Sequence, residues 1–282
     1  MKPRIYDCFP FFNENMLLAL RLELMYEHVD HFVIVESTHT FTGQPKQMYF
    51  SWEGLERYRD KIIHVIVDDM PIHLGDPVKN ETHQRNAILR GLKDARPDDL
   101  VLISDLDEIP DPKAIGRYDP RHVCGVLVQP LYCYFLNNLS ISGKTGQPDR
   151  WIKGKITTMR HLVNFYREPE FFRHLRPKGL LDMLRRLWHR IDAQPIERGG
   201  WHFSWVMTPE RMIQQIAAFS HTEYDSDDFK NVDSIKAALR DGKDIFGRDI
   251  HYRIVPLDDS FPPNLLASRE KYAQWIVEPA AK

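Results

Sequence analysis

Short apolar runs alternate with longer amphipathic segments through the first 105 residues. The apolar runs predict strands, which we place at Arg4–Phe9, His31–Ser37, Lys61–Asp69 and Asp99–Asp105. Apolar residues at helical spacing predict helices between them, at 13–29, 52–58 and 81–95. Strands that alternate with helices form mostly parallel sheets covered on both faces. The pattern therefore predicts an α/β fold with a mostly parallel central sheet and helices on both faces.

The second half of the chain has a less regular pattern. Strands are expected within 125–138 and 150–159, and the glycine-led stretch GGWHFSW at 199–205 is expected to be extended. Helices are expected at 179–191, 209–219 and 228–239. We find no internal repeat and no low-complexity linker. The chain is therefore expected to fold as one compact domain.

Acidic residues follow a strand that is predicted to be buried. In VLISDLDEIPDP, the residues Asp105, Asp107 and Glu108 come directly after the apolar run. Glu36 and the pair Asp68–Asp69 end two other predicted strands. Open α/β sheets bind ligands beyond the carboxyl ends of their strands. We therefore expect several carboxylates to gather at one site.

The Asp-x-Asp spacing places two carboxylates on one side of an extended segment. Oxygen ligands suit Mg²⁺ or Mn²⁺, which keep waters and substrate phosphates in their other positions. The chain has no P-loop and no GxGxxG, so a bound phosphate would need a metal or basic side chains. The alternative is that Asp105 and Asp107 cap the following turn.

Composition narrows the class of protein. A formal net charge of −2 gives no reason to expect a nucleic-acid partner. The three cysteines, Cys8, Cys124 and Cys133, are odd in number and form no CxxC pair, which predicts buried thiols in a reducing compartment. The N-terminus lacks a signal-peptide pattern, and no run of about 18 apolar residues occurs. We therefore expect a cytoplasmic protein.

Five stretches, in order, resemble glycosyltransferase family 17, which contains the enzymes that add the bisecting β-1,4-N-acetylglucosamine to N-glycans. They are Tyr6–Asn15, Val29–Gly43, Lys61–Pro71, Arg85–Pro110 and Gly199–Trp205. The resemblance implies a GT-A-like fold with a Rossmann-type sheet, a UDP-sugar donor such as UDP-GlcNAc, Mn²⁺ or Mg²⁺, and an inverting transfer to a glycan or glycolipid hydroxyl. We expect a single domain over 1–282, with a nucleotide-binding half to about 125, an acceptor and metal-completing half over 126–225, and a helical C-terminal extension over 226–282.

The resemblance also implies a metal site. Asp105 and Asp107 resemble the family's metal-binding Asp-x-Asp motif. A late histidine is expected to complete the site, and His202 is the first choice, with His221 second. The alternative for His202 is a histidine held within an aromatic cluster.

Nucleotide binding is expected from residues at strand and helix ends. Glu36 lies where related folds place an acid that contacts the nucleoside, and the alternative is a turn acid. Arg85 and Asn86 begin an apolar-faced helix, where Arg85 could pair with the diphosphate; together with Asp105 they are the expected nucleotide-sugar contacts. The alternative for Arg85 is a solvated helix arginine. A basic stretch beside Trp151 could close over the phosphates or lie on the surface: Arg150, Lys153 and Lys155.

An inverting transfer needs a carboxylate base. The candidates are Glu108, Asp149 and Glu223. Trp151, Trp201 and Trp205 offer flat faces for a sugar ring, although each can equally belong to the core. Two other classes stay open, a metal-dependent phosphoesterase and a non-catalytic glycan-binding protein.

One predicted helix has a membrane-binding pattern. Between 180 and 191, an apolar stripe is flanked by cations, with more cations just upstream: Leu180, Leu184, Leu187, Trp188 and Ile191 in the stripe, then Arg173, Arg176, Lys178, Arg185, Arg186, His189 and Arg190. Such a helix can rest weakly on an anionic membrane surface. The alternative is that the stripe packs on the protein's own core.

Overall fold

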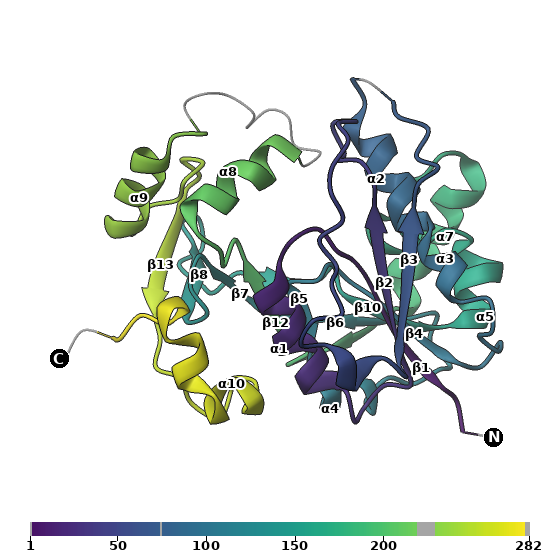
Figure 1. Cartoon of the computed structure of the whole chain (residues 1–282). Helices are drawn as coiled ribbons and strands as arrows, with labels where there is room; N and C mark the ends of the chain where they lie inside the picture. Colours follow the sequence, from purple (N-terminus) through teal and green to yellow (C-terminus); the bar gives the residue numbers. More distant parts are fainter. Residues whose placement is uncertain (1, 74, 219–228, 280–282) are drawn as a thin grey trace.

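A computed structural model describes residues 2–73, 75–218 and 229–279 (Figure 1). Its first sheet is built around four parallel strands in the order β3-β2-β1-β4. They are β1 (Ile5–Pro10), β2 (His31–Ser37), β3 (Ile62–Val67) and β4 (Leu100–Ile103). The sheet continues from β4 through β10 (Lys155–Thr158), β6 (Gly125–Leu127) and β11 (Gln194–Ile196). Strand β10 is antiparallel to both of its neighbours, so the sheet is mixed.

A second, mixed sheet was not predicted. Its order is β13-β8-β7-β12-β5, with β9 paired to β7. The strands are β5 (Glu108–Pro110), β7 (Gln129–Cys133), β8 (Asn138–Ser142), β9 (Arg150–Trp151), β12 (Gly200–Ser204) and β13 (Ile250–Ile254). The predicted α/β class is confirmed, and the first sheet is mostly parallel as expected, but the pattern did not predict that a second sheet accompanies it. Strands β5 and β9 are only three and two residues long, too short to give a readable alternation.

Helices cover both faces of the first sheet. The helices are α1 (Asn15–Met25), α2 (Pro77–Asn86), α3 (Ile88–Gly91), α4 (Pro112–Ile115), α5 (Met159–His161), α6 (Pro169–His174), α7 (Leu180–Asp192), α8 (Pro209–Ala218), α9 (Val232–Arg240) and α10 (Pro263–Ala267). The helix expected over 81–95 is two shorter helices, and the first begins at a Pro with Asp76 as its N-cap. The segment expected to be a helical extension also supplies β13 to the second sheet.

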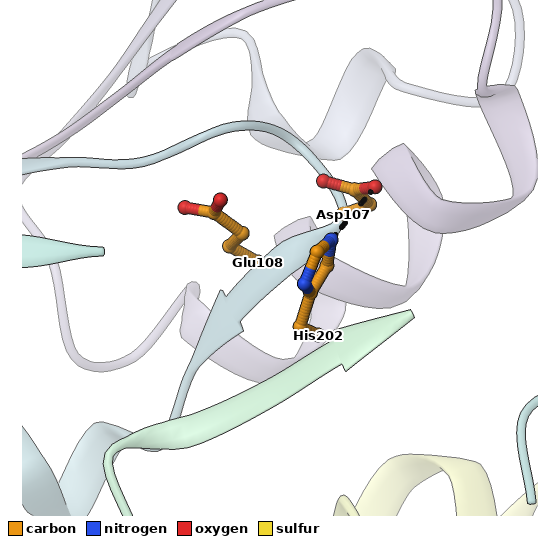
Figure 2. A group of neighbouring side chains, drawn as sticks. All are labelled: Asp107, Glu108 and His202. Carbon is orange, nitrogen blue, oxygen red and sulfur yellow. Dashed lines mark hydrogen bonds and ion pairs between the residues drawn. The ribbon is translucent and has the colours of Figure 1, made fainter. Parts of the chain in front are cut away.

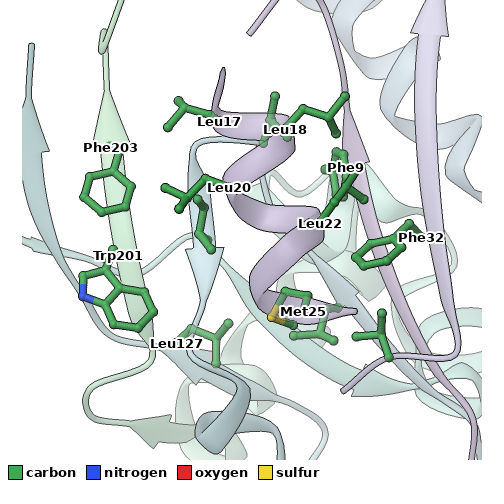
Figure 3. Packing of buried hydrophobic residues seen from close by; sticks show 14 of the residues in the cluster. Phe9, Leu17, Leu18, Leu20, Leu22, Met25, Phe32, Leu127, Trp201 and Phe203 are labelled. Carbon is green, nitrogen blue, oxygen red and sulfur yellow. The ribbon is translucent and has the colours of Figure 1, made fainter. Parts of the chain in front are cut away.

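Helix α1 lies between the two sheets and joins them (Figure 3). Leu22 faces Phe9 and Phe32 of the first sheet, while Leu17 and Leu20 face the β12 side chains of the second. An apolar helix of this kind is buried on more than one side. Alternating residues of β1, β2 and β4 point to the opposite face, where α3 and the cluster around Cys8 pack. Among the described residues, no helix has the length and apolar character needed to cross a bilayer.

Candidate active site

A cavity of about 550 Å³ opens at the carboxyl ends of β1, β2 and β4. This size is ordinary for a small-molecule site. Its walls come from residues 10–14, 39–46, 78–85, 105–107, 151–153, 173–176 and 215–218. The predicted position of the site beyond the strand ends thus coincides with a cavity in the structure.

The second sheet brings His202 to the acidic loop (Figure 2). Strands β12 and β5 are antiparallel with His202 directly opposite Glu108, and the Phe203 amide donates to the Asp107 carbonyl at 2.8 Å. The Nε2 atom of His202 lies 3.3 Å from Oδ2 of Asp107. Asp107, Glu108 and His202 each present one ligand atom within 4.8 Å of the others. Asp105 is absent from this group.

The environment of His202 leaves one nitrogen without a partner. Its Nδ1 is buried and has no hydrogen bond. Burial lowers the pKa of His202, but the nearby carboxylates, Asp107 foremost, together outweigh it, and the net shift is upward. The Trp151 ring lies over the imidazole with centroids 4.4 Å apart. His202 therefore sits in an aromatic setting and beside a carboxylate at once.

Glu108 is already fully occupied by protein donors. Its carboxylate is buried and forms a two-pronged pair with Arg173, whose Nη1 lies 2.7 Å from Oε2. The other oxygen also accepts from Trp151 Nε1, and the Asp105 amide donates to Oε2 at 3.1 Å. A carboxylate held by a guanidinium is a poor proton acceptor. The structure therefore argues against Glu108 as the base.

Asp105 is held by two arginines. Nη1 of Arg85 lies 2.6 Å from Oδ1, and Arg173 pairs with Oδ2. Burial raises the pKa of Asp105, but the two guanidinium groups outweigh it and hold the pKa well below its usual range. The two acids of the motif thus differ, because Asp105 has arginine counter-ions and Asp107 has a histidine.

Arg21 of α1 holds the acidic loop from beneath. Its fully buried guanidinium pairs with Asp7 at 2.6 Å. It also donates to the carbonyls of Asp105 and Leu106, at 2.8 and 3.1 Å, and to the Ser104 hydroxyl at 2.7 Å. Arg21 was not among the site residues predicted from the sequence. Its signal is an arginine in an otherwise apolar helix, together with an aspartate inside an apolar strand.

Arg85 lines the cavity but is not a solvated helix arginine. Its three guanidinium nitrogens donate to Asp105, Glu81 and Glu170. Each nitrogen is thus already bonded to a carboxylate, so the predicted diphosphate would have to compete with three acids for this guanidinium. Asn86 lies behind the cavity wall, where its Oδ1 accepts from the Glu170 amide at 3.0 Å.

Glu36 does not line the cavity. Its fully buried carboxylate accepts from the backbone amides of Tyr49 and Phe50 and pairs with Lys46 at 3.2 Å. These bonds hold the 38–50 loop against β2. The turn-acid alternative therefore describes its position, and the predicted nucleoside contact does not fit.

The three cations of the predicted basic stretch lie in three different environments. Lys153 lines the cavity, and so does Arg176 beyond α6. Arg150 is exposed and pairs with Glu197. Lys155 is buried and donates to the carbonyls of Phe172 and Arg173. The surface alternative holds for Arg150 alone.

The remaining predicted residues are divided between site and core. Trp151 lines the cavity, whereas Trp201 is buried and donates to the Ser260 carbonyl at 2.7 Å. Trp205 packs against Phe246. Asp149 is absent from the cavity lining, and its Oδ2 accepts from Ser140 at 2.6 Å. His221 and Glu223 lie outside the described residues.

Glu14 is a cavity residue that the sequence analysis missed. It lies beyond the carboxyl end of β1, and its Oε2 accepts from the amides of Phe12 and Asn13 at 3.2 and 3.0 Å. Burial raises the pKa of Glu14, and the nearby Asp107 carboxylate raises it further. Its signal in the sequence is the same as that of Glu36 and Asp105, an acid near the carboxyl end of a predicted strand, here β1.

The glycine pair before His202 serves strand packing. A Cβ at Gly200, where φ is +134°, would lie 2.1 Å from the Ile109 carbonyl oxygen. A Cβ at Gly199 would lie 2.7 Å from the backbone of Leu127 and Val128. The close approach is thus between β12 and neighbouring backbone, not between backbone and ligand.

Comparisons with known proteins agree with the resemblance drawn from the sequence. Residues 1–128 match glycosyltransferase family 17. Beta-1,4-mannosyl-glycoprotein 4-beta-N-acetylglucosaminyltransferase of Rattus norvegicus is 23% identical over 299 residues, and that of Homo sapiens is 24% identical over 303 residues. The alignments cover 98% of this chain but 54% and 55% of those proteins, so the chain spans about half the length of these relatives.

A solved structure assigned as a glucose-1-phosphate thymidylyltransferase from Bacillus anthracis superposes with a TM-score of 0.39 at 9% identity. The superposition covers 70% of this chain and 87% of the chain in the solved structure. The sequence comparisons confirm the predicted resemblance to glycosyltransferase family 17.

Proposed function

We propose, from its relation to glycosyltransferase family 17, that this chain is a GT-A-like, metal-dependent and inverting glycosyltransferase. The donor we propose is a UDP-sugar, UDP-GlcNAc first, and the acceptor is a glycan or glycolipid hydroxyl. The observation that carries the proposal is the Asp107–His202 pair, in which Asp107 lines the strand-end cavity and His202 is buried directly behind it. The names of the relatives support the choice of N-acetylglucosamine.

Asp107 and His202 are the residues that would hold the metal. The orphaned Nδ1 and the short Nε2–Oδ2 distance of 3.3 Å fit an imidazole and a carboxylate that share a cation. Two protein ligands suit Mn²⁺ or Mg²⁺, because substrate phosphates and waters fill the other positions. When bound, such an ion neutralises the leaving diphosphate. Glu108 would stay with Arg173 and Trp151 and hold the loop in place.

The cavity cations would bind the donor's phosphates. Lys153 and Arg176 line the cavity, and within the described ranges the carboxylate that pairs with Arg176 is that of Glu170, at 3.9 Å. Arg85 and Arg173 are already paired with carboxylates. We therefore assign the phosphate contacts to Lys153 and Arg176. Arg85 is instead a positioning residue that fixes Asp105.

Glu14 is the carboxylate we assign as the base. Both of its amide hydrogen bonds go to Oε2, which leaves Oε1 able to take the proton of an acceptor hydroxyl. A raised pKa brings a carboxylate closer to the range where a base works well near neutral pH. Trp151 beside His202 offers a flat apolar face to a sugar ring.

The central test is Asp107→Ala. With Mn²⁺ and UDP-GlcNAc near 100 times Kd, the wild type should gain several degrees in Tm, since binding at that level contributes about 2.7 kcal/mol. The variant should lose this shift and release no UDP in the presence of acceptor. Asp98→Ala removes an exposed aspartate elsewhere and serves as the control. UDP release by Asp107→Ala at the wild-type rate in Mn²⁺ would contradict the proposal.

The same assay separates the other two classes. A phosphoesterase would hydrolyse p-nitrophenyl phosphate with Mn²⁺ and gain no stability from a nucleotide sugar. A glycan-binding protein would be stabilised by oligosaccharides alone. Two-metal phosphoesterase sites need a dense ligand set. The described residues contain a single group of three potential ligands, Asp107, Glu108 and His202. Three ligands are few for two metal ions, which disfavours the phosphoesterase.

A further inference from the structure

Helix α7 is amphipathic, and its apolar side faces solvent. Seven apolar side chains on the helix are 53–73% exposed: Leu180, Leu181, Met183, Leu184, Leu187, Trp188 and Ile191. At about 100° per residue, all seven fall on one side of the helix. The alternative that the stripe packs on the protein's own core is therefore wrong. Exposed apolar patches of this kind mark interaction sites.

The side of α7 that faces the protein is polar and fixed by specific contacts. His189 is buried, with Nδ1 2.8 Å from the Tyr166 hydroxyl. The Asp192 carboxylate accepts from the Val123 amide at 2.7 Å. Rotating the helix to bury its leucines would break both contacts and leave the Val123 amide without this partner. The apolar face must therefore be covered by something outside the described chain.

The charges around this face favour an anionic partner. Arg186 and Arg190, one turn apart, border the apolar side, and neither has a carboxylate partner among the described residues. Arg176 and Lys178 lie just before the helix with 61% and 64% of their side chains exposed, although Lys178 pairs with Glu168 at 2.7 Å and Arg176 lies 3.9 Å from Glu170. The acids on the helix are engaged, Asp182 with Arg185 at 2.8 Å and Asp192 with the Val123 amide. A second copy of this chain would bring the same cations together.

We propose that α7 is an interfacial membrane helix that binds the surface of an anionic lipid bilayer. Its leucines and Trp188 would enter the headgroup boundary, while Arg186 and Arg190 extend toward lipid phosphates. The attraction of each cation to such a surface is modest, so binding is weak and reversible. The cavity residue Arg176 precedes Leu180 by four residues, so their Cα atoms lie within about 14 Å of each other. Binding would thus hold one cavity wall close to the lipid surface.

The test is sedimentation of the full chain with vesicles. Vesicles of phosphatidylglycerol and phosphatidylcholine should bind the protein, and pure phosphatidylcholine vesicles should bind it at least tenfold less. Binding should fall sharply from 0.15 M to 1 M salt, as the Debye length falls from about 8 to about 3 Å. Arg186→Glu with Arg190→Glu should weaken binding more than tenfold. Arg240→Glu with Lys243→Glu makes the same charge change at exposed cations elsewhere and should have little effect.

Apolar variants test insertion separately from charge. Leu184→Ser, Leu187→Ser and Trp188→Ser combined should abolish vesicle binding without lowering Tm, because all three side chains are more than half exposed. Ile66→Ser removes an exposed apolar side chain on β3 and is the control. Equal binding to neutral and anionic vesicles, or none to either, would overturn the proposal. So would a dimer in the absence of lipid that the triple variant dissociates. None of these readouts depends on the catalytic activity.

Discussion

Two aspartates of one short motif have different surroundings, and the difference comes from their counter-ions. Asp105 is fixed between Arg85 and Arg173, so its charge is neutralised by the protein itself. For Asp107, the close side-chain partner in the described part of the chain is the imidazole of His202. A cation gains more from a carboxylate whose charge is not already paired. At the scale of the residue, we therefore propose Asp107 as the metal ligand and Asp105 as part of the scaffold around it.

His202→Ala should weaken Mn²⁺ binding by about 10- to 100-fold, the range seen when a metal site loses a supporting contact. The proton competes with the metal, and Asp107 raises the pKa of His202 above its ordinary 6.5. Wild-type affinity should therefore rise with pH through that range, and the variant should show a flatter profile. Without metal the sign reverses: the Asp107–His202 pair stabilises the fold below pH 6.5, and this is lost as pH rises through the raised pKa.

Mn²⁺ titration by calorimetry from pH 5.5 to 8.5 measures the loss of affinity in the variant and the pH profile of affinity in both proteins. His251→Ala is a matched control, because His251 also lies near an aspartate, Asp249 at 3.9 Å, but on the exposed strand β13. Unchanged Mn²⁺ affinity in His202→Ala would exclude the imidazole as a ligand.

Glu14→Gln should lower kcat by about 10²- to 10⁴-fold, the usual contribution of a general base. Glutamine keeps the size of the side chain and can still accept from the Phe12 and Asn13 amides. The Kd for the donor with Mn²⁺ should therefore stay within about twofold. Loss of kcat with unchanged donor binding separates a base from a structural role. Glu108→Gln should instead lower Tm, because it removes the partner of buried Arg173.

At the scale of elements, the site depends on how closely β12 approaches β5. His202 reaches Glu108 and Asp107 because the strand pairs directly with the end of the acidic loop. That approach needs Gly200, whose backbone conformation and contact with the Ile109 carbonyl exclude a side chain.

Gly200→Ala should therefore destabilise the protein by about 2–4 kcal/mol, or displace β12 and lose Mn²⁺ binding. Gly116→Ala is the control, since the nearest atom to its Cβ is 4.0 Å away and its φ is −69°. Urea unfolding of both variants measures the difference. If Gly200→Ala has the wild-type urea midpoint and the wild-type Mn²⁺ affinity, the backbone around Gly200 accommodates a side chain and the prediction is wrong.

Elements near one another in sequence were predicted better than pairings between distant segments. The strand at His31–Ser37 is predicted to the residue, because its apolar run is long and flanked by polar residues. No pattern in the sequence predicts that β5 pairs with β12, some 90 residues later. Nor does any pattern predict that Arg173 pairs with Asp105 and Glu108. Periodicity also predicted correctly that α7 has an apolar and a polar side, but it did not predict which side faces the protein. Only the contacts of His189 and Asp192 decide that.

At the scale of the whole molecule, the cavity is a joint product of both sheets. The first sheet supplies the strand ends that lead into the acidic loop, and the second supplies Trp151 to the wall and His202 as the partner of Asp107. Helix α1 holds the two sheets together through its leucines and holds the acidic loop through Arg21. Global stability and the geometry of the site are therefore coupled.

Lys155 makes the stability of the fold around the site depend on pH. It is buried in β10 and donates to the carbonyls of Phe172 and Arg173 at the end of α6, which carries Arg173 into the site. Burial lowers the pKa of Lys155 to about 7 from its ordinary 10.5, with Arg173 and Lys153 adding to the shift. Between those values, the unfolded chain binds a proton that the folded chain has released. Stability from this group therefore rises with pH over that window and is flat below it.

Lys155→Met removes the titration but keeps an unbranched side chain of similar length. The free energy of unfolding of the wild type minus that of the variant should rise from pH 7 to pH 10, because groups common to both proteins cancel in the difference. Urea unfolding at pH 6, 7, 8, 9 and 10 gives this difference, and Lys144→Met at an exposed lysine is the matched control for loss of a lysine. A difference that stays constant over the range would mean that Lys155 keeps its proton through its bonds to the two carbonyls. In that case the end of α6, and Arg173 with it, would be held by a buried ammonium group at every working pH.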